Sequence, residues 1–112
     1  MNYPLKITVI KVCEPKDIIG KDFIRESGKS IPKCGFFTEG DQFIIPETGA
    51  MPEGFICIHA FNAINKHVEV LRLGGSIEDW TGEDTIYGVC PDGIRPVIFK
   101  IERIKKENNF GD

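Results

Sequence analysis

The sequence predicts an α+β domain in which a small, mainly antiparallel sheet carries one long helix and ends in a C-terminal β-hairpin. Three features of the sequence predict this fold class. Apolar and polar residues alternate over residues 5–12, as in a strand with one buried face. Apolar residues recur at helical spacing over residues 53–73. Two strand-like runs flank a turn between residues 84 and 104.

The N-terminal half is expected to hold two strands, at residues 5–12 and 42–46. The segment CEPKDIIG that follows the first strand can form a single helical turn, opened by its proline and closed by its glycine. Residues 25–35, RESGKSIPKCG, have the composition of a loop. The proline at the end of the second strand stops it, because proline has no N–H group to donate to a neighbouring strand.

The long helix is expected over residues 53–73. Its apolar residues are three or four positions apart and therefore share one face: Cys57, Phe61, Ile64, Val68 and Leu71. Pro52 suits the first helical turn, and the pair Gly74–Gly75 provides the stop. The predicted core joins this face to the inward faces of the strands: Ile7, Val9, Phe43, Phe61, Ile64, Val68, Leu71, Val97, Phe99 and Ile101.

The hairpin is expected from strands at residues 84–90 and 95–104, joined by Pro91-Asp92-Gly93 as a three-residue loop. This loop would pair Cys90 with Ile94, Tyr87 with Val97, and Thr85 with Phe99. Both faces of such a hairpin are apolar, with Tyr87, Val97, Phe99 and Ile101 on one and Ile86, Ile94 and Ile98 on the other. One helix cannot cover both faces, so we expect a homo-oligomer, specifically a dimer.

Length and composition fit one soluble domain at residues 1–104, followed by a polar, frayed tail at residues 105–112. Of the 112 residues, 41% are hydrophobic and 28% charged, which is ordinary for a globular protein. The net charge of −3 and the scattered basic residues argue against nucleic acid as a partner. The sequence has neither a signal peptide nor the run of about 20 apolar residues that spans a membrane, so a cytoplasmic location without membrane contact is expected.

Several short motifs suggest chemistry but lack the context that it needs. The segment SGKS at residues 27–30 ends like a phosphate-binding loop, but the earlier glycine is missing and a proline follows. The segment HVE at residues 67–69 resembles part of a zinc deaminase motif, without the Pro-Cys-x-x-Cys that completes it. Asp41 and Asp92 could serve a hydrolase or isomerase, but turn chemistry explains both. The sequence therefore leaves the question of enzymatic activity open.

Three of the four cysteines are candidates for a thiol site. Cys34, Cys57 and Cys90 stand at the ends of predicted elements, where sites are usually built, whereas Cys13 stands at a strand end without a motif and is expected to be structural. Three converging thiols would bind zinc or another soft metal, or act in redox chemistry. The competing interpretation, which we favour, is that they are small buried side chains, as free cysteines often are.

Arg95 and His59 are further candidates near these cysteines. The planar guanidinium of Arg95 could bind a carboxylate or phosphate, although an ion pair with Asp92 is the simpler expectation. On a regular helix His59 lies about 200° from Cys57, so the two residues should not share a site unless the helix begins after residue 58. His59 is expected at the surface or an interface. The leading function is therefore a small binding or interaction module, with the thiol site of Cys34, Cys57 and Cys90 as the alternative.

The chain also resembles a family of small uncharacterised bacterial and archaeal proteins. The resemblance covers residues 5–104 and rests on four motifs. These are Cys34 with Phe37, Gly40, Asp41 and Phe43; Met51, Pro52, Gly54 and Cys57; Gly74-Gly75; and the run CPDGIRPVIFKIER from Cys90 to Arg103. The resemblance supports the fold and the positions of its elements, and it implies no activity.

Overall fold

The computed structural model describes residues 2–105, and they form an α+β fold built on one four-stranded antiparallel sheet. The strand order is β2-β1-β4-β3. The elements in chain order are β1 (Leu5–Val12), α1 (Pro15–Ile19), β2 (Gln42–Ile45), α2 (Ile58–Arg72), α3 (Glu78–Thr81), β3 (Thr85–Val89) and β4 (Val97–Arg103). The predicted fold class and all four predicted strands are confirmed. The predicted tail lies outside the described residues except for its first residue, Lys105.

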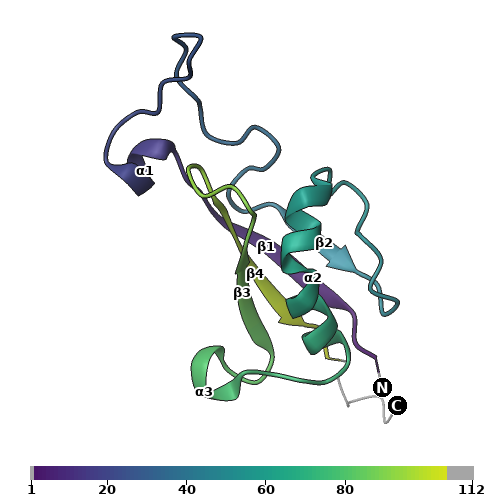
Figure 1. Cartoon of the computed structure of the whole chain (residues 1–112). Helices are drawn as coiled ribbons and strands as arrows, with labels where there is room; N and C mark the ends of the chain where they lie inside the picture. Colours follow the sequence, from purple (N-terminus) through teal and green to yellow (C-terminus); the bar gives the residue numbers. More distant parts are fainter. Residues whose placement is uncertain (1, 106–112) are drawn as a thin grey trace.

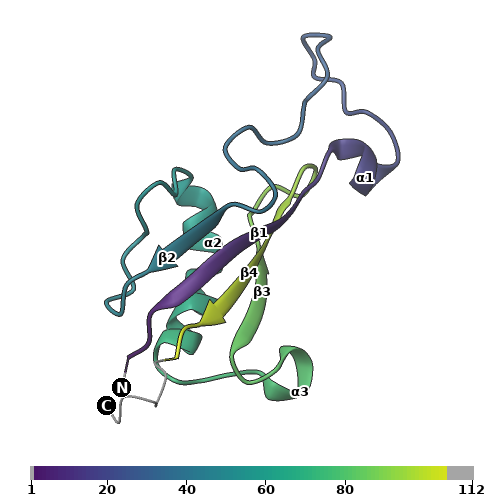
Figure 2. The same ribbon diagram turned by 180° about the vertical axis from the view of Figure 1, so that it is seen from behind.

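The sheet has one face covered by α2 and one face on which no helix of the described chain lies (Figures 1 and 2). Nine of the ten predicted core residues are buried between α2 and the sheet, and Phe43 is half-buried at the margin. A β-bulge at Ile10 lets β1 place apolar side chains on the buried face on both sides of the bulge. The register with β4 shifts between Val9 and Lys11, so that Val12 returns to the buried face.

The long helix begins at Ile58, five residues later than predicted. Pro52 is not in its first turn but starts a separate turn, in which the N–H of Phe55 bonds to the carbonyl of Pro52. Cys57 is extended and forms the N-cap, with its sulfur accepting the N–H of Ala60. The predicted stop is confirmed, since Gly74 has a φ of 94° that favours glycine.

The predicted hairpin register is wrong. Val89 pairs with Ile98 and Tyr87 with Lys100, so the connection is longer than Pro91-Asp92-Gly93. The shift is by an odd number of residues, and it therefore turns every side chain of β3 to the other face. Ile86 and Gly88 face the core, while Tyr87 lies on the open face rather than beside Phe99.

Phenylalanine rings from strands, helix and loops form one cluster in the core. Phe37 and Phe55 lie outside the strands and helices, yet their ring centroids are 5.0 Å apart, and each packs on Phe99 of β4, at 5.2 and 5.6 Å. Phe61 of α2 contacts Phe55 at 5.8 Å. The cluster therefore holds the segments before β2 and before α2 firmly against the sheet.

Arg103, at the end of β4, joins the far end of α2 to the start of β3. Its guanidinium bonds to the carbonyls of Leu71 and Gly75 at 2.6 and 2.9 Å, and to the carbonyl of Glu83. Its Nε pairs with Asp84 at 3.1 Å. The positive charge thus lies at the negative end of the helix, where it is stabilising.

None of the helices within residues 2–105 is long and apolar enough to cross a membrane.

Candidate functional site

The start of α2, the β3–β4 connection and the segment before β2 lie at one end of the sheet (Figure 1). Residues of these three segments line a pocket of about 340 Å³. We call it the thiol pocket. It is lined by Cys34, Phe36, Cys57, His59, Cys90, Pro91, Asp92 and Arg95. All four residues that the sequence indicated as candidate ligand-binding residues therefore line one pocket. Its volume lies in the lower part of the range of small-molecule sites.

Cys34 reaches the pocket from the segment before β2. Its sulfur accepts the N–H of Phe36 at 3.4 Å, which holds a local turn. Phe37, which follows directly, is buried in the aromatic cluster and fixes this segment on the sheet. Phe36 itself is 56% exposed and forms an apolar wall of the pocket.

Cys57 and His59 line the pocket together, which corrects the expectation that they could not share a site. That expectation placed Cys57 within the helix. Because Cys57 is an extended N-cap and not a helical residue, the rotation of 100° per residue does not apply between them. Phe55, two residues earlier and buried in the aromatic cluster, anchors the approach to the helix.

Cys90 lies at the mouth of the β3–β4 connection, opposite Val97. The N–H of Cys90 bonds to the carbonyl of Val97 at 3.1 Å, and the N–H of Val97 returns a bond to the Cys90 sulfur at 3.3 Å. The sulfur thus replaces a carbonyl at the end of the strand ladder. Pro91 and Asp92 follow immediately and form part of the pocket wall.

The three pocket sulfurs have one bonding feature in common: each accepts a backbone N–H. Each sulfur is therefore held in a fixed position at the wall of the pocket. Within residues 2–105, however, no group of three or more His, Cys, Asp or Glu side chains has an arrangement that could hold a metal ion. The soft-metal site at Cys34, Cys57 and Cys90 gains no support from this arrangement and stays a prediction.

Arg95 makes the ion pair that the sequence favoured. Its Nε lies 3.2 Å from Asp92 Oδ2, and its Nη1 donates to the carbonyl of Pro32 at 2.9 Å. Burial opposes ionisation of Asp92, but bonds from the N–H groups of Ile94 and Arg95 and from the Arg95 guanidinium outweigh it and hold the pKa of this carboxyl below its usual value. Arg95 is therefore held in a fixed orientation at the pocket wall.

Cys13 differs from the three pocket cysteines. Its side chain is 7% exposed and does not line the thiol pocket. Burial raises the pKa of its thiol, and the negative charge of Asp17 adds to the shift. Cys13 is thus a buried, less reactive thiol, as predicted from its lack of context, and it provides an internal reference for the other three.

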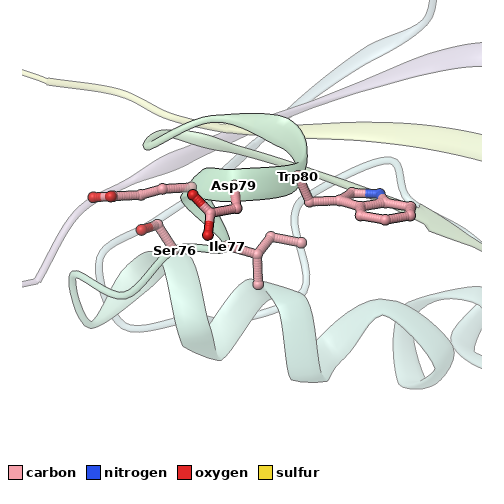
Figure 3. Close-up of a pocket in the computed structure, with 5 residues that line it drawn as sticks. Ser76, Ile77, Asp79 and Trp80 are labelled. Carbon is pink, nitrogen blue, oxygen red and sulfur yellow. The ribbon is translucent and has the colours of Figure 1, made fainter.

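A second hollow, of about 440 Å³, is formed by five consecutive residues around α3 (Figure 3). The ring of Trp80 extends away from Ser76 and Asp79, and 84% of this residue is exposed. The hollow is larger than the thiol pocket, but it is made by one short segment and brings no distant residues together. The thiol pocket is therefore the better candidate site.

No protein family model matches the chain, and comparison with curated proteins and with solved structures finds no match either. The resemblance to a family of small bacterial and archaeal proteins stays a prediction.

Proposed function

We propose that this protein is a small binding module whose ligand occupies the thiol pocket. The observation that supports the proposal is that Cys34, Cys57, Cys90 and Arg95 come from distant parts of the chain and line a single pocket. The aromatic cluster supports it further, because Phe37 and Phe55 hold two of the lining segments in place without a ligand. A preformed site loses little conformational entropy when it binds.

The second candidate is a thiol-based function at the same residues, either redox exchange or binding of a soft metal. The observation that favours it is that three sulfurs, each held by a backbone N–H, line the same pocket. The two candidates differ in what they require. A binding module needs only an accessible pocket, whereas the thiol function needs reactive sulfurs.

The first experiment is per-residue alkylation of the native protein with iodoacetamide, read by peptide mass spectrometry. We expect Cys34, Cys57 and Cys90 to react while Cys13 stays protected, because burial and a raised pKa both slow it. Small molecules that raise the melting temperature should slow alkylation of the three pocket cysteines and leave the Cys13 rate unchanged.

Metal content, measured on protein purified without a histidine tag, separates the second candidate from the first. Bound zinc in stoichiometric amount would favour the metal function. If metal is absent and all four thiols are inert until the protein is denatured, the cysteines serve packing alone and the thiol function is refuted. The binding function then fails as well, because a reagent as small as iodoacetamide does not reach the sulfurs that line the pocket.

We also propose that the chain forms a dimer through the outer edge of β3. With the observed register, the N–H and C=O groups of Tyr87 and Val89 point away from β4, and both side chains are close to half exposed. The strand has no charged residue and no proline, the usual protections of a free edge. Sedimentation velocity should give a dimer that Val89→Lys dissociates; a strict monomer at high micromolar concentration would refute the proposal.

A cytoplasmic location completes the proposal, since all four cysteines are free and a reducing compartment keeps thiols in that state. We expect the protein in the cytosolic fraction with four reduced thiols; recovery in an oxidised, disulfide-bonded form would contradict this.

A further inference from the structure

The charged groups at the thiol pocket differ in how many hydrogen bonds they can still make to a ligand. Besides His59, the ionisable oxygen- and nitrogen-bearing side chains among the lining residues are those of Asp92 and Arg95. The two oxygens of Asp92 are both used: Oδ1 accepts the N–H groups of Ile94 and Arg95 at 2.9 and 3.2 Å, and Oδ2 accepts Arg95 Nε at 3.2 Å. This carboxylate has little capacity left for a ligand.

Arg95 keeps most of its donors. A guanidinium carries five N–H groups, and the Arg95 side chain uses one on Asp92 and one on the Pro32 carbonyl. Its Nη2 has no hydrogen-bond partner among residues 2–105. The side chain is 32% exposed and lines the pocket. Because Asp92 and Pro32 hold the guanidinium still, an anion gains a preformed two-pronged donor.

The rest of the lining adds to this preference. His59 lies in the first turn of the 15-residue α2, and this turn contains no acidic residue to offset the positive end of the helix. Phe36, Pro91 and the sulfurs supply the apolar part of the wall, and sulfur is a polarisable partner for an apolar group. A ligand that suits both parts has an anionic end and an apolar body.

We infer that the ligand of the thiol pocket is a small organic anion whose carboxylate, or oxyanion of similar size, binds Arg95 while its apolar body packs against Phe36 and Pro91. This inference rests on the proposed binding function and specifies its ligand class. It assigns Arg95 as the residue that selects negative charge.

The test compares two alkylating agents of nearly equal size, iodoacetate and iodoacetamide, which differ in charge. In both reactions a thiolate displaces iodide, so the ratio of the two rates at one cysteine cancels its thiolate fraction. The same ratio measured in denatured protein cancels the intrinsic reactivity of the reagents. We expect the iodoacetate-to-iodoacetamide ratio at Cys90, the cysteine nearest Arg95 in sequence, to be about three- to tenfold higher in the folded protein.

Arg95→Met should remove this preference, and Arg25→Met, which removes a positive charge from an exposed loop residue, should leave it unchanged. If Arg95→Met does not fold, the native protein in about 0.5 M NaCl provides an independent test, because salt of this strength screens a partly exposed charge within a few ångströms. The preference should then fall towards unity.

The outcomes separate the inference from the proposed function. If the pocket cysteines react with both agents and show no preference for iodoacetate in the folded state, the anionic ligand is refuted and the binding pocket stands. If they prefer the neutral agent, the pocket selects uncharged ligands and the role of Arg95 is refuted. If neither agent reaches them, the binding function fails as well.

Discussion

The substitution Arg103→Met tests how much one buried side chain contributes to the free energy of unfolding. The Arg103 side chain is 3% exposed, and its guanidinium bonds to carbonyls at Leu71, Gly75 and Glu83 and pairs with Asp84. It also stacks over the ring of Tyr3, 5.0 Å from the centroid. Methionine keeps a flexible apolar stem of similar width, so the substitution removes the charge and the donors and little packing.

The expected loss follows from these contacts. Hydrogen bonds to a charged group contribute about 1.5–3 kcal/mol each and are not additive. Removing one partner of a buried ion pair costs about 3–5 kcal/mol. Asp84 is partly exposed and keeps Lys105 at 3.2 Å, which lessens the cost on its side. The three carbonyls lose their donor, and the value for the whole change is therefore about 3–5 kcal/mol.

Urea unfolding measures this loss. For a slope of about 2 kcal/mol per molar urea, the midpoint should fall by about 2 M while the slope is unchanged. Arg103→Lys keeps the charge but cannot reach all the carbonyls, so it should lie between the wild type and Arg103→Met. Arg25→Met, at an exposed position, should change stability by less than about 0.5 kcal/mol. A loss below about 1 kcal/mol for Arg103→Met would show that water replaces the guanidinium at little cost.

Three further predictions use the same assay. Phe61→Ala should cost about 3–5 kcal/mol because the ring is almost fully buried; a loss under about 1 kcal/mol would show that the ring is not part of a packed core. Gly88→Ala would place a methyl group 2.8 Å from Ile64 Cγ2 and should cost about 1–3 kcal/mol. Ile64→Ala removes Cγ2 itself, so the double variant should lose less stability than the sum of the two single variants, and strictly additive losses would contradict the clash. Burial opposes ionisation of Asp84, yet hydrogen bonds from Arg103 and Lys105 hold its pKa below the ordinary value. A lowered pKa gives stability that is present above about pH 4 and lost as the pH falls further, so Asp84→Asn should flatten the acid limb of the stability curve, and an unchanged limb would show that other groups cause it.

The strands were predictable because their side chains alternate, but the start of the helix was not. Cys57 continues the spacing of the apolar stripe backwards and Phe55 broadens the apolar surface, yet both contact the core from a non-helical segment. Apolar periodicity reports which residues are buried and not which conformation buries them. The better signals were Pro52 and Gly54, which mark a turn at this point.

The hairpin register could not be derived from β3 alone. Apolar side chains occupy both faces of this strand, at Ile86, Tyr87 and Val89. The sequence pattern therefore did not indicate which face is buried. The turn preference of Asp92 led to the prediction of a three-residue loop. In the structure its carboxylate accepts the N–H groups of Ile94 and Arg95 and stabilises a longer loop. A side chain that takes over backbone bonding in this way leaves no periodic signal.

Position at an element end, together with a sequence motif, was a better guide to the candidate site than residue type. Cys34, Cys57 and Cys90 have both and line one pocket, whereas Cys13 follows β1 without a motif; the role of the three pocket cysteines stays a prediction. His59 was set aside on the assumption that a regular helix already included Cys57. Phe36 was missed because a single exposed aromatic residue in a loop carries no pattern of its own.

The pairing of β1 with β4 has a consequence for how the chain acquires its structure. These two strands form the centre of the sheet, although they lie at residues 5–12 and 97–103. During synthesis, the first strand has no central neighbour until almost all of this sequence has left the ribosome. The entropy of closing so long a loop must be overcome before the sheet gains most of its contacts. Until then Leu5, Ile7 and Val9 lack their partners on β4, although β2 can already pair with the other edge of β1, and exposed apolar strands of this kind are what chaperones protect in nascent chains.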